Sequence, residues 1–243
     1  FLGLSNFVKL FSDRTLLISI FNTFVIAVIY LSIKIPLVVL LSSLLHKLNK
    51  ATKLFLTIFF IPTTIGMFTY GIIFRFMFSN DGIINELLGI FGIHLLFLDN
   101  GFLAKFVIAL ALVFSTFGTM VLFLLISMKN NISNEIYDAS KIDGAGFFAR
   151  MRYITLPVLW PLISVFILFG IIESSSLIDI PYQLTGGGPN NKTITIGYYI
   201  YKQAINYGNF SYASTISFVT LLLIIIIVYT PKKMRGKYNV ENY

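Results

Sequence analysis

The sequence predicts an all-α, polytopic bundle of transmembrane helices that carries a cytoplasmic helical hairpin. Hydrophobic residues make up 57% of the 243 residues and charged residues only 12%, whereas a soluble domain has about 25% charged residues. Several runs without charge reach the length of about 20 residues that a helix needs to cross a bilayer. Lipid is therefore the expected solvent for most of the chain.

Five spans follow from these runs, and together they form a single transmembrane domain over residues 1–243. The first span contains Lys34 and Pro36, although a lone charge in lipid is costly. Pro62 and Gly66 in the second span and Pro161 in the fourth predict breaks, which lipid tolerates only where neighbours or water satisfy the freed backbone groups. An ordinary kink and a functional hinge both fit such breaks. The expected spans are residues 16–45, 54–78, 106–128, 153–178 and 211–230.

The positions of the basic residues predict the orientation in the membrane. Most of the 18 Lys and Arg residues flank the connections after the first and third spans and the C-terminal tail, which the positive-inside rule places in the cytoplasm. Residues 129–157 then form a cytoplasmic loop, and residues 79–105 and 181–210 are external. Because these residues do not form one basic face, nucleic acid is not an expected partner. The basic residues assigned to the cytoplasmic side are Lys47, Lys50, Lys53, Lys129, Lys141, Arg150, Arg152, Lys232, Lys233, Arg235 and Lys237.

This orientation puts the start of the chain outside. Residues 1–6 lack the basic region, apolar core and cleavage site of a signal peptide. We therefore expect a further span to precede Phe1, which gives six spans in the full-length protein. The external run LLGIFGIHLLFL, residues 87–98, is too short to cross the membrane and is expected to lie at its surface or against the bundle.

Catalytic and metal-binding chemistry is not expected in this chain. It has no cysteine, which excludes disulfides and thiolate metal sites, and His46 and His94 are isolated. GGGPNNKT imitates a phosphate-binding loop, but Asn191 stands where that motif requires glycine before the lysine. We therefore predict no catalytic residue and no metal site.

The cytoplasmic loop reads as two short helices joined by a glycine turn. A helical pattern ends at Ile142, Gly144 and Gly146 supply the turn, and a second helical pattern runs over residues 147–154. Asn131 or Ser133 is the expected N-cap of the first helix. An apolar patch with a charged rim indicates a docking surface for a partner protein, the alternative being a solvated loop. The apolar members are Ile136, Ala139, Ile142 and Phe147.

This segment resembles the EAA loop of binding-protein-dependent ABC importer permeases. That pattern is EAA, a glycine after three residues, an isoleucine after nine more, and Leu-Pro after one further residue. Here Asp and Ser replace the Glu and the second Ala, while the spacing is complete. The resemblance implies that the loop couples to an ATPase through Glu135, Asp138, Ala139, Ser140, Gly144, Ile154, Leu156 and Pro157.

Further stretches are similar to the MalF-type permease of carbohydrate importers: FSNDGIINELLG, LIDIPYQLTGGGP and YIYKQAINYGNFSYASTISF. The resemblance implies a multi-pass permease of the bacterial cytoplasmic (inner) membrane that imports a sugar or oligosaccharide. The implied partners are a MalG-like permease, an external substrate-binding protein and two ATP-binding subunits that hold the ATP and Mg, so that this chain carries no cofactor. A non-sugar cargo, such as a glycerophosphodiester, a polyol or a peptide-like solute, and an ion-coupled secondary transporter are the alternatives.

The resemblance also places the substrate path near the end of the fourth span. Its candidate residues are Glu173, Ser174, Ser176 and Leu177. Polar groups at membrane depth usually face a cavity or a partner. Glu173 departs from the small or aromatic residue usual in the family. It is therefore expected to contact substrate, to pair with Lys34, or to lie near the outer interface.

Overall fold

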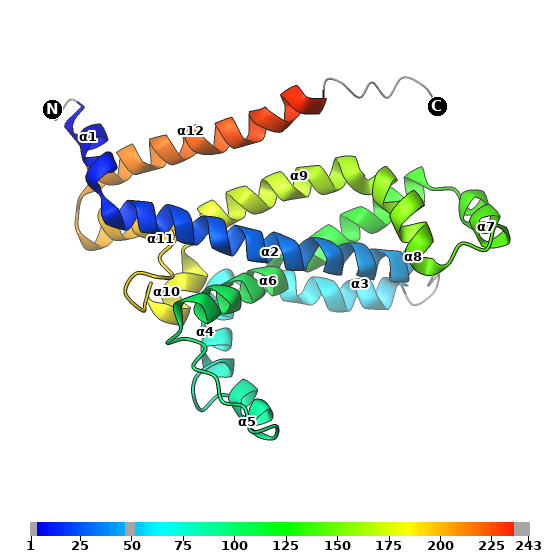
Figure 1. The fold of residues 1–243 in the computed structure, drawn as a ribbon, viewed down its shortest axis with the longest axis horizontal. Coiled ribbons are helices and arrows are strands. Elements are labelled where there is room, and N and C mark those ends of the chain that lie inside the picture. The colour runs from blue at the N-terminus through cyan, green and yellow to red at the C-terminus, as the bar shows by residue number, and fades with distance from the viewer. Residues whose placement is uncertain (1–3, 47–51, 236–243) are drawn as a thin grey trace.

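The computed structural model describes residues 4–46 and 52–235, and within these ranges it contains helices and no strand (Figure 1). Its helices long and apolar enough to cross a membrane are Arg14–His46, Gly101–Asn131, Phe147–Ser175 and Phe210–Ile227. A bent pair, Leu54–Thr64 with Met67–Met77, makes a fifth span if it is counted as one. The predicted all-α helical bundle is confirmed. Lys47, Lys50 and Lys237, used above for the orientation, lie outside the described residues.

The centre of the bundle is the pair α2 (Arg14–His46) and α6 (Gly101–Asn131), which lie side by side (Figure 1). Both helices turn small residues toward their contacts. Ser19 and Ser42 of α2 and Ala104, Ala109 and Ala111 of α6 are fully buried. Small side chains let helices approach closely in lipid, where van der Waals packing drives association. The pair α2 and α6 therefore forms the scaffold against which several of the remaining helices pack.

The segment expected as one span over residues 54–78 is divided in the structure. It consists of α3 (Thr52–Phe60), the 3-10 turn Ile61–Thr64 and α4 (Met67–Met77), and the two halves meet at 94°. Gly66 is extended at the break, and the Tyr70 hydroxyl donates to the Pro62 carbonyl at 2.8 Å. The Pro62 carbonyl also accepts from the Ile65 N–H at 3.2 Å, so the backbone at the break stays hydrogen-bonded, as the membrane requires.

The first half of this segment packs against α6 because α6 has a glycine at the contact. A Cβ on Gly118 would lie 1.9 Å from the carbonyl oxygen of Phe59. Real side chains do not tolerate that distance, so the backbones of α3 and α6 touch only because this residue is glycine. Gly118 thereby fixes the direction of α3 along the spans.

The part of the chain after α9 (Leu156–Ser175) folds back over one end of α2. It contains α10 (Asp179–Thr185), α11 (Ile196–Tyr201), the π-helical turn Lys202–Asn206 and α12 (Phe210–Arg235). The Asn22 amide donates to the carbonyls of Asn191 at 2.8 Å and Ile194 at 3.0 Å, and Thr23 accepts from the Ile196 N–H at 2.9 Å. The expected turn TGGGPNN is thus held by side chains of α2. Beyond this region α12 diverges from α9 (Figure 1).

A carboxylate joins α12 to the same end of α2. Asp13, between α1 (Ser5–Ser12) and α2, accepts hydrogen bonds from the hydroxyls of Tyr199 at 2.7 Å and Tyr212 at 2.6 Å and from the Leu16 N–H at 3.0 Å. Burial raises the pKa of the Asp13 carboxyl, but the hydrogen bonds outweigh burial and hold this pKa below its ordinary value. The charged form is therefore the one that the fold stabilises.

This linkage makes a prediction about pH. Because the folded pKa of Asp13 is depressed, its stabilising contribution is fully present above an unfolded pKa of about 4 and is lost as pH falls through the folded pKa. We expect wild-type protein in lipid to have a higher unfolding temperature than Asp13→Asn at neutral pH, with the difference shrinking only below about pH 4. Asp143→Asn, at an exposed position, is the control. A constant difference across the pH range would contradict this role.

Candidate functional sites

The hairpin predicted from the sequence to be cytoplasmic forms at the end of the bundle opposite α10 and α11 (Figure 1). It consists of α7 (Asn134–Ile142) and α8 (Phe147–Arg150). Ser133 occupies the N-cap of α7 without a capping hydrogen bond from its side chain. The chain continues from α8 through the π-helical turn Met151–Thr155 into α9. The hairpin is therefore the direct extension of a membrane-spanning helix.

Gly144 makes the turn between the two hairpin helices. Its φ is +77°, its N–H donates to the Lys141 carbonyl at 3.0 Å, and the Ala145 N–H donates to the Ser140 carbonyl at 2.9 Å. This pair of bonds is a Schellman motif, which requires a left-handed residue just past the helix end. A Cβ added at Gly144 would meet open space. Glycine is therefore favoured here by the positive φ and not by crowding.

A second set of contacts anchors the hairpin to the membrane helices. The hydroxyls of Tyr137 and Thr155 lie 2.8 Å apart, and the Tyr137 ring lies against His46 with centroids 5.2 Å apart. Ile154 and Leu156 pack partly buried against the core. These two EAA-pattern residues therefore hold the base of the hairpin. Tyr137 was not singled out from the sequence, because one tyrosine in a helical pattern carries no signal for such a role.

The outer surface of the hairpin is apolar. Ile142 is 87% exposed and Phe148 is 71% exposed, and Ile136 is also exposed. Exposed side chains of this size at one place indicate an interaction surface. Phe148 was missed by the sequence analysis, which chose Phe147, a residue that the structure half-buries. The two phenylalanines are adjacent in the sequence. Which of them faces outward depends on the orientation of α8, which the sequence pattern does not report.

The remaining pattern residues of the hairpin and the start of α9 differ in exposure. Glu135, Asp138, Ala139 and Pro157 are exposed, whereas Ser140 is buried and donates to the Tyr137 carbonyl at 2.7 Å. Asp138 pairs with Lys141 at 2.6 Å. Both side chains of this pair are exposed, so the bond itself contributes little stability. These charges form the polar rim of the apolar surface.

A polar cluster lies inside the bundle, where α2, α6 and α9 meet. The Glu173 carboxylate accepts a hydrogen bond from the Tyr30 hydroxyl at 2.6 Å and lies 3.6 Å from the Lys34 Nζ. Lys34 also donates to the Tyr30 hydroxyl, and the Thr116 hydroxyl of α6 is 2.9 Å from the same oxygen. The structure thus brings together Lys34 and Glu173, which are 139 positions apart in the sequence.

The two charges of this cluster differ in their access to solvent. The Lys34 side chain is 5% exposed and that of Glu173 is 33% exposed. A buried charge is tolerated when it is paired and hydrogen-bonded, and Tyr30 supplies the additional bond. Tyr30 was missed by the sequence analysis, because a tyrosine within an apolar span reads as ordinary core.

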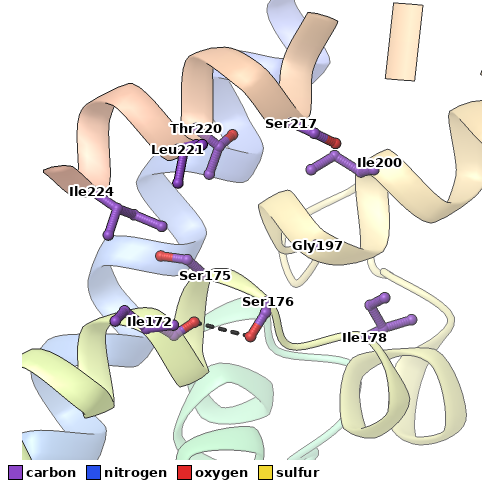
Figure 2. Close-up of a pocket in the computed structure, with 10 residues that line it drawn as sticks. All are labelled: Ile172, Ser175, Ser176, Ile178, Gly197, Ile200, Ser217, Thr220, Leu221 and Ile224. Carbon is purple, nitrogen blue, oxygen red and sulfur yellow. Dashed lines mark hydrogen bonds between the residues drawn. The ribbon is translucent and has the colours of Figure 1, made fainter. Parts of the chain in front are cut away.

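The other candidates for the substrate path lie apart from one another. Ser174 is fully buried and donates to the Gly170 carbonyl at 2.8 Å, while Leu177 is buried and its carbonyl accepts from the Thr195 hydroxyl. Ser176 is exposed and donates to the Ile172 carbonyl at 3.0 Å (Figure 2). Of these three, Ser176 lines a cavity (Figure 2).

That cavity is a pocket of about 280 Å³ between the end of α9, α11 and α12 (Figure 2). Its hydroxyls on α9 and α12 donate to carbonyls of their own helices, so they present mainly carbon to the pocket. In this conformation the pocket is apolar in character and offers few hydrogen bonds to a polar solute. The lining residues with hydroxyl groups are Ser175, Ser176, Ser217 and Thr220.

Comparison with known proteins identifies relatives along most of the chain. No protein-family model matches it. It is 33% identical over 234 residues to the lactose transport system permease protein LacF of Rhizobium radiobacter, which covers 93% of this chain and 78% of the relative. It is 31% identical over 230 residues to the trehalose/maltose transport system permease protein MalF of Thermococcus litoralis, covering 93% of this chain and 76% of the relative.

A solved structure shares the fold. The crystal structure of a bacterial alginate ABC transporter in complex with an alginate pentasaccharide-bound periplasmic protein matches with a TM-score of 0.81. Sequence identity is 21%, and the match covers 96% of this chain and 82% of that chain. At this identity the likeness shows a common arrangement of helices.

The helical bundle and its hairpin define a multi-pass membrane protein of the permease class. The identities with LacF and MalF show the particular family: the chain belongs to the permease subunits of ABC importers. The family resemblance predicted from the hairpin and the flanking stretches is confirmed. As in those relatives, the chain is the transport subunit of its system.

The polar cluster makes a prediction that a double-mutant cycle tests. Glu173→Gln leaves the Lys34 charge buried without its partner, and we expect it to lower the free energy of unfolding by about 3 kcal/mol. Lys34→Met should cost less, because Glu173 is partly exposed and can be hydrated. The double variant should lie within about 1 kcal/mol of wild type, because no unpaired charge remains. Unfolding in lipid nanodiscs provides the measurement.

Lys105→Met is the matched control, because Lys105 is also buried and pairs with no carboxylate in the part of the chain that the structure describes. The loss in the free energy of unfolding caused by Lys105→Met should be the same in the wild-type and Glu173→Gln backgrounds. Additive losses for Lys34→Met and Glu173→Gln would show that the two side chains do not stabilise each other.

Proposed function

We propose that this chain pairs with a MalG-like permease, two ATP-binding subunits and an external substrate-binding protein to import a sugar or oligosaccharide across the bacterial cytoplasmic membrane. ATP would be hydrolysed on the separate ATP-binding subunits, with its Mg ion. The observation that carries the proposal is the exposed apolar hairpin, held rigidly at the end of a membrane-spanning helix. Within an ABC importer, such a surface fits a cleft on an ATP-binding subunit.

Docking of the hairpin provides the coupling. The surface of Ile136, Ile142 and Phe148 would enter the partner, while Tyr137, Thr155 and Ile154 hold the hairpin to the base of α9. A partner shifts a conformational equilibrium only by its differential affinity for the two states. Closure of the ATP-binding subunits would therefore favour the membrane conformation whose hairpins best fit the closed pair.

The cargo is inferred from the relatives. LacF and MalF are described as lactose and trehalose/maltose permeases, and the alginate transporter was solved with a pentasaccharide-bound periplasmic protein. A saccharide is named for all three, and the alginate complex includes the periplasmic protein that binds it. The ion pair with Lys34 supports a positioning role for Glu173 between α2 and α9 over the substrate contact considered from the sequence.

The proposal is tested by ATPase stimulation in the full assembly. The transporter, reconstituted in lipid with its binding protein, should hydrolyse ATP faster when the binding protein carries its saccharide, because loaded binding protein favours the conformation that closes the ATP-binding subunits. A panel of mono- and oligosaccharides identifies the cargo. Absence of stimulation by every saccharide, with stimulation by a glycerophosphodiester or a polyol, would overturn the sugar assignment. Transport that continues without ATP but stops with the ion gradient would overturn the ABC mechanism.

The same assay tests the hairpin through Gly144→Val. A β-branched residue is strained at positive φ, so we expect the variant to remain in the membrane while saccharide-driven stimulation and transport are lost. Gly146→Ala is the matched control, because Gly146 has ordinary φ and a Cβ there meets open space. Gly144→Asn, which tolerates the left-handed region, should retain partial coupling. Wild-type transport in Gly144→Val would contradict the coupling role.

A further inference from the structure

An apolar projection leaves the side of the bundle beyond α4, across the direction of the long helices (Figure 1). It comprises residues 76–100, from the last turn of α4 through α5 (Ile83–Gly89) to the start of α6, and is here called the external finger. Figure 1 shows α5 as the element farthest from α9 and α12, beyond α4. The run 87–98, expected from the sequence as one short helix, is helical only to Gly89 and then returns irregularly toward α6.

The direction of the finger follows from the bend before α4. Because α3 packs along α6 through Gly118 and α4 meets its direction at 94°, α4 runs across the spans and therefore close to the plane of the membrane. The depth of α4 in the membrane is set by its contact with α10. A Cβ on Gly71 would lie 2.7 Å from the Gln183 Cβ and 3.3 Å from the Asp179 carbonyl, so α4 touches α10 at the outer end of α9.

Internal contacts make the finger a defined structure. The Asn85 side chain is buried, donates to the carbonyls of Ser79 at 3.2 Å and Leu95 at 2.9 Å, and accepts from the Leu95 N–H at 3.0 Å. The rings of Phe78 and Phe97 meet edge to face with centroids 5.1 Å apart. The Asn85 side chain thus supplies the hydrogen bonds that hold α5 against the irregular segment that returns to α6.

The outside of the finger is mostly apolar. Ile83, Leu87 and Ile90 recur at helical spacing and are exposed, and the following turn exposes Phe91 at 78%. Phe76 on α4 is exposed as well. The apolar surface therefore covers the helix, the turn and the adjoining helix end. It continues onto the first turn of α6, where Phe102 is exposed, and so joins the lipid-facing surface of the spans.

Two features favour lipid over a protein partner as the covering of this surface. The exposed apolar residues occupy several parts of the finger. A protein interface covers one face, whereas a fluid lipid environment can cover all of these parts together. Asp81, Glu86 and Asp99 are also exposed on it. Carboxylates are costly within hydrocarbon, so a segment with an apolar body and acidic residues lies at the boundary between the acyl chains and water.

We propose that the external finger inserts among the lipids of the outer membrane leaflet and anchors the bent half of the second span along the membrane plane. Its charged residues are acidic, so insertion rests on apolar contact with acyl chains and does not depend on anionic headgroups. The anchor would hold α4 against α10, next to the end of α9 that carries Glu173.

The position of the finger is measured by tryptophan fluorescence in the complete reconstituted transporter. The chain has one tryptophan, Trp160, so Trp160→Phe provides a silent background for Ile90→Trp and Leu87→Trp. Leu222→Trp, on the lipid-facing part of α12, is the lipid reference, and Lys192→Trp, at an exposed loop position, is the aqueous reference. Tryptophans of other subunits are replaced in the same background.

We expect lipids brominated on their acyl chains to reduce the emission of Ile90→Trp to an extent similar to Leu222→Trp, with greater effect from bromines near the headgroup. Acrylamide in water should reduce it less than it reduces Lys192→Trp. The result should be the same in membranes with and without anionic lipid. Strong quenching by acrylamide would place the finger in water, and protection from both quenchers would place it against another protein. Either result overturns the proposal, and Leu87→Trp provides the same readings if Ile90→Trp does not assemble.

Discussion

The buried charge of Lys34 is the constraint that the contacts among α2, α6 and α9 have to meet. A lysine that is 4% exposed within an apolar span requires a carboxylate and further hydrogen bonds, and Glu173 and Tyr30 supply them. Because Glu173 lies near the outer end of α9 and Lys34 lies in α2, the pair fixes the two helices to one another. Thr116 extends this contact to α6, so three helices share one polar centre.

The helix that carries Glu173 also carries the hairpin. Residues Phe147–Ser175 form one continuous span, so a displacement of the docking surface at Phe148 is transmitted along α9 toward Glu173. The contact between Tyr137 and Thr155 ties α7 to the same helix. The hairpin and the polar centre therefore lie toward opposite ends of the same span, so a partner that moved the hairpin would act on the helix that contacts α2.

The sequence was sufficient for the helical class, the hairpin and its turn at Gly144, because charge-free runs and positive-φ glycines follow local rules. It predicted a break near Pro62 and Gly66 but neither its 94° angle nor the contact of Gly71 with α10, which lies far away in the sequence. Ser174 and Leu177 were predicted in the substrate path, and the structure buries both. The Leu177 carbonyl accepts a hydrogen bond from Thr195, eighteen residues away, and no local pattern reports such a contact.

The central claim, that the hairpin docks on an ATP-binding subunit, is tested most directly by site-specific cross-linking. The chain contains no cysteine, so Phe148→Cys introduces a single thiol on the docking surface, and Asn206→Cys, at an exposed position beyond α11, introduces one at the opposite end. With a thiol-to-amine cross-linker in the assembled transporter, Phe148→Cys should form an adduct with the ATP-binding subunit and Asn206→Cys should not. Absence of this adduct, or equal adducts from both positions, would contradict the account.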